Sequence, residues 1–270
     1  MAERRFDPAR LPGFGVIAIA VVVLLYLPIA TLVGYSFNAG GSVADWQGLS
    51  LRWYRAAWQN DVVREAALRS LLIACLASAI ATAVAVPAAI AILRHRAMPG
   101  RGLAYMAINQ PLMVPEIVTA VALLVLVAAL KKATGYQGLG YLVVAHSAFC
   151  IPFAYLPVAA RLEGMDPGLE LAAADLYATP FAAFRHVTLP LLGPGIAAGA
   201  MLAFVISLDD VVITEFVKSA GQDTLPTYML GQMRRGVTPE VNAVSTLLLA
   251  VTVVLLTAFF IINRTDRETT

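Results

Sequence analysis

Six long intervals without charged residues constrain this chain more than any other feature. A helix needs about 20 apolar residues to cross the hydrocarbon core of a bilayer, where every backbone polar group must be paired within the protein. The intervals contain 23 to 34 residues each, so every one could hold a crossing. They lie between Arg10 and Asp45, Arg69 and Arg94, Arg101 and Lys131 (interrupted by Glu116), Lys132 and Arg161, Arg185 and Asp209, and Glu240 and Arg264. The sequence therefore predicts an all-α membrane protein with six transmembrane helices.

Composition excludes several other classes of protein. With 60% hydrophobic and 13% charged residues, the chain cannot present the surface of a water-soluble domain, and its apolar runs are too long and too weakly alternating for barrel strands. A net charge of +2 indicates no nucleic-acid partner. Cys75 and Cys150 lie in apolar stretches without metal-ligand spacing, so we expect free, buried thiols and no metal site.

Orientation in the membrane follows less directly from the sequence. The first span, roughly residues 13 to 36, is too long for the apolar region of a signal peptide and is interpreted as an uncleaved helix. An even number of spans places both termini on one side, but the basic residues are divided almost evenly between the two sides. Arginines near helix ends on the side of the termini favour cytoplasmic termini; they are Arg4, Arg5, Arg10, Arg94, Arg96 and Arg101. Aromatic residues on the other side indicate an outer interfacial belt, and these are Trp46, Trp53, Tyr54 and Trp58.

The segment after the fourth span predicts two short helices. Asp166 followed by Pro167 is a typical helix start, and Thr179 followed by Pro180 repeats it. We expect a helical elbow that is closed by Pro190 and by the Gly-Pro-Gly cluster at 193–195. Either a groove on another protein or the chain's own bundle must cover its apolar residues, which are Leu171, Leu176, Tyr177, Phe181 and Phe184.

This segment resembles the cytoplasmic EAA loop of permease subunits in binding-protein-dependent ABC importers. Ala172 and Ala173 match the two alanines of that pattern, and Val187, Leu189 and Pro190 match its later positions. Leu171 stands where the family usually has Glu, and Tyr177 stands where it usually has Gly. Either Glu170 substitutes at an offset of one residue or the contact is remodelled. The resemblance implies that residues 167–188 dock in a cleft of an ATPase subunit, and the coupling residues would be Glu170, Leu171, Ala172, Ala173, Leu176, Tyr177, Phe181, Leu189 and Pro190.

Two further stretches are similar to the spermidine/putrescine branch of these permeases, particularly its C-type subunit. They read SLDDVVITEFV at 207–217 and PTYMLGQMRRGVTPEVNA at 226–243. The resemblance implies a single permease domain of the type I importer class over residues 1–270, with a cytoplasmic coupling loop at 161–190, in the bacterial inner membrane. It also implies three kinds of protein partner within the lipid bilayer or beside it. These are a second, related permease subunit that forms a heteromer with this chain, two ATPase subunits that use ATP and Mg²⁺, and a periplasmic binding protein.

Carboxylates inside predicted spans need a physical reason, because one at the bilayer centre costs about 2.5 to 3.5 kcal/mol on insertion scales. The fifth span is expected to carry Asp209, Asp210 and Glu215, with Asp209 roughly 28 Å beyond Pro190 at 1.5 Å per residue. Helical neighbours point about 100° apart, so only one Asp of the pair can face the pathway squarely. Either these carboxylates attract a cationic amine in an outward cavity, or the Asp pair caps or pairs across the interface between two permease subunits.

Two other polar residues in predicted spans have structural interpretations. Glu116 follows Pro115 in a broken stretch, where we expect a kink in the third span. His146 in the fourth span lacks a second metal ligand at a useful spacing and is interpreted as a satisfied interior histidine.

The sequence contains no phosphate-binding loop and no His-Glu-x-x-His or Gly-x-Ser-x-Gly motif, which predicts a transport subunit without enzymatic activity. Within the importer class, the substrate could be a polyamine or another small organic ion such as aminobutyrate or an opine. A different class, a gradient-driven secondary transporter, would use Asp209, Asp210, Glu116 and His146 as proton or sodium sites. A membrane scaffold without transport activity is a third class.

Overall fold

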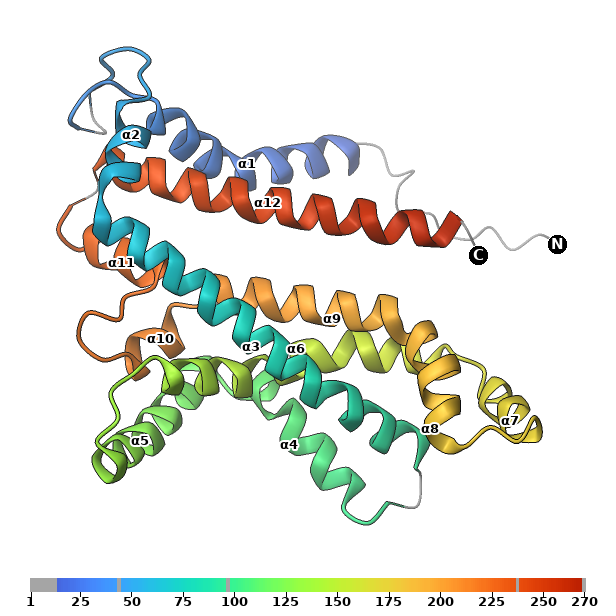
Figure 1. Cartoon of the computed structure of the whole chain (residues 1–270). Coiled ribbons are helices and arrows are strands. Elements are labelled where there is room, and N and C mark those ends of the chain that lie inside the picture. The colour runs from blue at the N-terminus through green and yellow to red at the C-terminus, as the bar shows by residue number, and fades with distance from the viewer. Residues whose placement is uncertain (1–13, 43–44, 96–97, 237, 269–270) are drawn as a thin grey trace. The chain divides into compact units, whose positions relative to one another are not determined.

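The computed structural model describes residues 14–42, 45–95, 98–236 and 238–268 (Figure 1). The arginines at positions 4, 5, 10 and 96, which bear on orientation, lie outside these ranges, as does the expected start of the first span at residue 13. Within the described ranges the regular secondary structure is helical, apart from one isolated antiparallel bridge between Asn38 and Leu49. Its contacts divide into two compact units, Met1–Asp61 with Met229–Val251, and Val62–Tyr228 with Thr252–Thr270.

Among the described residues, six helical stretches are long and apolar enough to cross a membrane, which confirms the predicted fold class. They are Gly15–Ser36, Asp61–Arg94, Glu116–Thr134, Gly140–Glu163, Pro180–Asp209 and Pro239–Ile261. Exposure of their largely apolar, outward-facing side chains would cost free energy in water, but not against lipid or a partner's helices.

The first unit contains α1 (Phe14–Ser36), α2 (Arg52–Gln59) and the first part of α12 (Pro239–Glu268). The Asn38 side chain organises the loop between α1 and α2: its amide nitrogen donates to the Asp45 carbonyl oxygen at 2.6 Å, and its oxygen accepts from the Gln47 amide at 2.9 Å. The Tyr54 hydroxyl bonds that of Ser36 at 2.6 Å. Trp46 and Trp58 are exposed, and their place at the outer interface stays a prediction.

The second unit is built around α6 (Gly140–Glu163) and α9 (Leu189–Asp209), which lie side by side (Figure 1). Small residues of α9 allow this close approach: a Cβ added at Gly199 would lie 2.5 Å from the Ala154 carbonyl oxygen, and one at Gly195 would lie 2.6 Å from the Arg161 Cβ. Membrane helices commonly associate through such small residues at a spacing of four. The remaining elements of this unit are α3 (Asp61–Arg94), α4 (Arg101–Met113), α5 (Glu116–Thr134), α7 (Gly168–Asp175), α8 (Pro180–Ala183), the π-helical turn η2 (Phe184–Thr188), α10 (Val212–Val217), the start of α11 (Leu225–Met233) and the last part of α12.

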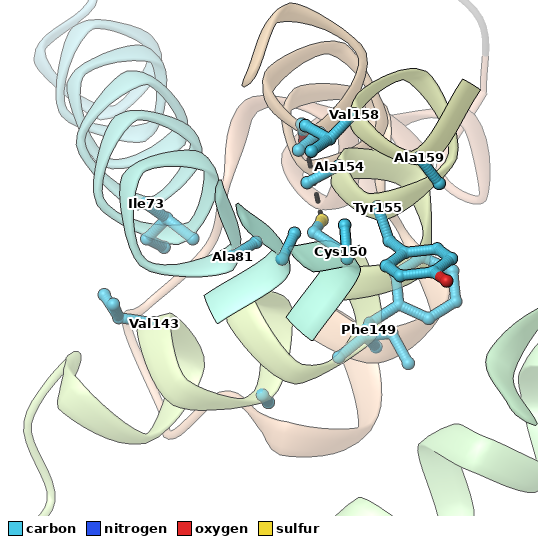
Figure 2. Packing of buried hydrophobic residues seen from close by; sticks show 14 of the residues in the cluster. Ile73, Ala81, Val143, Phe149, Cys150, Ala154, Tyr155, Val158 and Ala159 are labelled. Atoms are coloured by element: carbon cyan, nitrogen blue, oxygen red, sulfur yellow. Dashed lines mark hydrogen bonds between the residues drawn. The ribbon is translucent and has the colours of Figure 1, made fainter. Parts of the chain in front are cut away.

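The apolar core of this unit joins α3, α6 and α9. Figure 2 shows Ala81 of α3 near Cys150 and Ala154 of α6, with Ile73 of α3 and Tyr155 of α6 at opposite sides of the group. The Cys150 thiol is buried and donates a weak hydrogen bond to the Ala203 carbonyl oxygen of α9 at 3.5 Å. Cys75 is exposed on α3, so the expectation that both thiols are buried is wrong for this one, since α3 turns that face away from the unit's core.

The third predicted span is not one helix. α4 ends at Met113 and α5 begins at Glu116, so the expected kink is a complete break. Val114 is extended (φ −106°, ψ 137°) because the ring of Pro115 disfavours helical backbone in the preceding residue. Within this interval, α5 alone has the length of a crossing.

The end of the elbow was predicted wrongly. Pro190 and the Gly-Pro-Gly cluster do not close it, because α8, η2 and α9 continue without a non-helical residue from Pro180 to Asp209. Pro190 lies in the first turn of α9, where a missing N–H group costs little, and Pro194 removes only one bond from a helix that packs tightly on α6.

Candidate functional site

The elbow at residues 166–188 has two helix starts near the predicted residues. The Thr179 hydroxyl accepts a hydrogen bond from the Ala182 amide at 3.3 Å, and Pro180 takes the first helical position, as predicted. The other helix, α7, begins at Gly168, one residue later than the Asp166–Pro167 pattern indicates. The Asp166 carboxylate still caps it by accepting from the Gly168 amide at 2.8 Å.

The elbow presents apolar side chains away from its own unit. Tyr177 is 97% exposed and Leu176 is 82% exposed, and Leu171 and Phe181 are also exposed. Phe184 is half-buried and Ala173 is buried, so these two residues attach the elbow to the unit instead. Ala172, Leu189 and Pro190 are exposed beside the apolar group. A patch of this kind, which we call the elbow patch (Leu171, Leu176, Tyr177 and Phe181), is typical of a protein-binding surface.

Tyr177 adopts a left-handed backbone conformation with φ 61°, and it is the one non-glycine residue of the described chain that does so. Glycine adopts this conformation without steric cost, whereas a side chain at Cβ makes it unfavourable. Its amide donates to the Ala174 carbonyl oxygen at 2.9 Å, which ends α7 in a tight turn. The elbow therefore makes a turn that suits the glycine of the EAA pattern, but with tyrosine in that position.

Glu170 points into the unit and not toward the elbow patch. Its carboxylate accepts from the Thr188 hydroxyl at 3.0 Å and lies 3.4 Å from the Arg94 Nε at the end of α3. Leu171, the residue in the glutamate position of the EAA pattern, is exposed instead. Glu170 thus joins α7 to η2 and α3 through one carboxylate.

The carboxylates at the other end of α9 occupy different environments. α9 ends at Asp209, which is exposed, and Asp210 follows in an extended conformation (φ −65°, ψ 132°). Asp210 is buried, and its carboxylate accepts from the Ile213 amide at 3.1 Å, the Thr214 amide at 2.9 Å and the Thr214 hydroxyl at 2.8 Å. These bonds make Asp210 the cap of α10, and they explain why α9 ends immediately before Asp210.

Glu215 was predicted in the fifth span but lies in α10, beyond the break at Asp210. Its carboxylate binds the Lys218 ammonium at 2.6 Å, and Asp223 binds the same ammonium at 2.7 Å. Burial lowers the pKa of Lys218, but hydrogen bonds to Asp223 and Glu215 outweigh burial and hold this pKa above its usual value. Glu215 therefore shares the Lys218 ammonium with Asp223. We call residues 209–223, from the end of α9 through α10, the corner.

His146 and Glu116 approach the same corner from α6 and α5. His146 is 1% exposed, and its ring nitrogens bond the Ser207 hydroxyl at 2.8 Å and the Thr214 hydroxyl at 2.9 Å. The interpretation of His146 as a satisfied interior histidine is confirmed. Glu116, the first residue of α5 after Pro115, has its carboxyl group beside that of Asp210. Among the described residues, no group of three His, Cys, Asp or Glu side chains could hold a metal ion.

Comparison with known proteins identifies the family of this chain. Residues 81–267 match the family model described as the binding-protein-dependent transport system inner membrane component. The chain belongs to this family. It is 38% identical to the putrescine transport system permease protein PotI of Escherichia coli K12 over 264 residues, or 96% of this chain and 94% of that protein. It is 36% identical to the spermidine/putrescine transport system permease protein PotC of the same strain over 245 residues, or 91% of each chain.

Solved structures of ABC importers share the fold of this inner membrane component. A bacterial importer of the acidic polysaccharide alginate matches with a TM-score of 0.70 at 16% identity, covering 94% of this chain and 93% of that one. The methionine transporter MetNI matches with a TM-score of 0.64 at 19% identity, covering 78% of this chain and 97% of that one. The predicted family and importer-permease fold are confirmed, and the protein is a multi-pass membrane transport subunit, not an enzyme.

Several features of this inner membrane component were not predicted from its sequence. Capping by the Asp pair was one of the alternatives, but the sequence did not show that Asp210 alone caps α10 of its own chain. This capping and the ion pairs of Lys218 depend on contacts that short motifs do not carry. The left-handed Tyr177 had a visible signal, because the EAA pattern has glycine at this position. The predicted roles of Asp209, Asp210, Glu215 and the elbow residues in transport stay predictions.

Proposed function

We propose that this chain forms half of the translocation pathway of an ATP-driven importer for putrescine, spermidine or a related small amine. The observation that carries the proposal is similarity along almost the whole chain to two permease proteins, one named for putrescine and the other for spermidine and putrescine. A second, related permease subunit would complete the pathway, two ATPase subunits would bind below it, and a periplasmic protein would deliver the amine. The termini and the elbow would face the cytoplasm.

Asp209 is the carboxylate best suited to meet a cationic amine. It is exposed at the end of α9 away from the elbow, about 30 Å along the helix at 1.5 Å per residue. Asp210 and Glu215 have their oxygens engaged by α10 and by Lys218. A carboxylate in a cavity of low dielectric attracts an ammonium group more strongly than one in bulk water.

The elbow would couple this pathway to ATP. Closure of the ATPase subunits on binding ATP would move the elbow patch, and α8, η2 and α9 would carry that movement because they form one continuous helical segment. Glu170 would pass part of it to α3 through Arg94. The pathway would then open outward, and hydrolysis would reset it.

The test is uptake of labelled putrescine into proteoliposomes that contain both permeases and the ATPase, with the binding protein outside and ATP inside. We expect uptake to require both ATP and the binding protein. Asp209→Asn should raise the KM for putrescine about tenfold or more, because a hydrogen bond to a charged group contributes about 1.5 to 3 kcal/mol.

Glu65→Gln is the matched control, since Glu65 is an exposed carboxylate of α3 that pairs with Arg69 one turn away. It should leave the KM unchanged. ATP-dependent uptake of aminobutyrate or an opine in place of putrescine would replace the substrate. Uptake driven by a proton gradient without ATP would contradict the importer mechanism.

A further inference from the structure

The hydrogen bonds around His146 have one consistent direction when its ring is neutral and Asp210 is ionised. The Thr214 hydroxyl gives its proton to the Asp210 carboxylate, so it must accept a proton from the other side. That donor is His146 Nε2, at 2.9 Å. With the neutral ring protonated on Nε2, Nδ1 accepts from the Ser207 hydroxyl at 2.8 Å. A directed chain therefore runs from Ser207 through His146 and Thr214 to Asp210.

This series of hydrogen bonds joins three helices at the point where α9 ends. Ser207 lies in the last turn of α9, Thr214 lies in α10, and His146 reaches both from α6. All of these side chains are buried, and His146 Nε2 also lies 3.4 Å from the Asp210 carboxylate. A buried group of this kind orients its neighbours strongly, because each unmade bond would leave a polar atom unpaired away from water.

We propose that His146 is a positioning residue for transport. Acting through Thr214, it holds Asp210 on the first turn of α10 and thereby fixes Asp209 at the end of α9 as the carboxylate that meets the substrate. The role assigned to Asp209 rests on the proposed function, whereas the fixing of the corner does not. Neither His146 nor Thr214 touches the transported molecule.

Two substitutions of Thr214 separate this role from packing. Thr214→Val keeps the shape of the side chain but removes the hydroxyl, which leaves His146 Nε2 without its acceptor and Asp210 without one donor. Thr214→Ser keeps the hydroxyl and loses only a methyl group. A residue needed for packing would tolerate valine better than serine, whereas the hydrogen-bonded chain requires the reverse.

The first readout does not depend on the substrate. In the assembled importer with Cys75→Ser, the Asp209→Cys variant is labelled with a membrane-impermeant thiol reagent, while Cys150 stays buried. We expect Thr214→Val to change the labelling rate at least fivefold and Thr214→Ser to change it less than twofold. His146→Gln, whose amide can still donate to Thr214, should resemble Thr214→Ser, and His146→Leu should resemble Thr214→Val.

The second readout is transport by importers that retain Asp209. Thr214→Val should raise the KM of uptake about fivefold while kcat stays within twofold, and Thr214→Ser should restore the normal KM. Unchanged labelling and KM in Thr214→Val, or a larger defect in Thr214→Ser, would overturn the proposal. If the wild-type importer does not transport putrescine but labelling follows the expected order, the positioning role stands and the proposed substrate fails.

Discussion

Tyr177 combines a backbone conformation suited to glycine with a side chain that is almost fully exposed. The left-handed region costs a residue with a Cβ atom about 1 to 2 kcal/mol. The ring contacts almost nothing within the chain, so it does not offset that cost in the isolated subunit. A partner's surface is the place where the ring can contribute, which agrees with the proposed contact with an ATPase.

Tyr177→Gly should therefore stabilise the isolated permease and weaken its coupling. We expect the free energy of unfolding in detergent to rise by about 1 kcal/mol, because glycine removes the steric cost of the turn. ATP-dependent uptake should fall because the ring is lost. Tyr177→Ala is the control: it loses the ring but keeps the Cβ atom, so uptake should fall without the gain in stability. Normal uptake in both variants would show that the ring has no part in coupling.

The packing of α9 on α6 depends on the absence of a side chain at Gly199. Gly199 lies so close to Ala154 that an added Cβ would overlap the backbone carbonyl oxygen, which cannot rotate away. Gly193, in the same helix, has nothing within 4 Å of an added Cβ. One helix thus contains a glycine required for packing and another that is not.

The same substitution should have opposite effects at these two positions. Gly199→Ala should lower the free energy of unfolding by about 1 to 3 kcal/mol, as expected when extra atoms are forced into a packed core. Gly193→Ala should raise it by about 0.5 to 1 kcal/mol, because alanine favours helix over glycine. Thermal unfolding of the purified permease measures both. Equal effects would mean that the separation of α6 and α9 is not set at Gly199.

The sequence predicts helices of this chain better than it predicts where they break. A long uncharged interval shows that a segment can lie in lipid, and this was enough to locate five spans, whereas the third begins only at Glu116. The breaks depend on side chains that compete for backbone groups, as Asp210 does at the end of α9. Proline alone is ambiguous: Pro115 separates two helices, whereas Pro190 and Pro194 lie within one.

The corner was also predictable only in part, because its geometry depends on side-chain contacts between segments that are distant in the sequence. Asp209 and Asp210 are adjacent in sequence and equal in charge, yet α9 ends between them and one is exposed while the other is buried. Their difference arises from His146, 64 residues earlier than Asp210 in the chain, and from Thr214 in the next helix. The glycine position of the EAA pattern was the one local signal that indicated an unusual backbone.

At the scale of the whole molecule, each of the six spans carries the chain to the other side of the membrane. Successive connecting loops therefore lie on alternate sides. The elbow joins the fourth span to the fifth, and the loop with Lys218 joins the fifth to the sixth, so these two connections must lie on opposite sides of the membrane. The proposed importer requires the elbow in the cytoplasm, where the ATPase is. Tyr177 and Ala220 are exposed in these two connections and can report the side directly.

In intact cells carrying Cys75→Ser, a membrane-impermeant maleimide should label the Ala220→Cys variant and not the Tyr177→Cys variant. Inverted membrane vesicles should give the reverse, and adding the ATPase to them should protect Tyr177→Cys because the elbow patch would then be covered. Cys150, buried in both variants, provides the unlabelled background. Labelling of Tyr177→Cys from outside the cell would place the elbow away from any ATPase. The exposed apolar side chains of the elbow would then need a periplasmic partner, and ATP could not act on this chain through them.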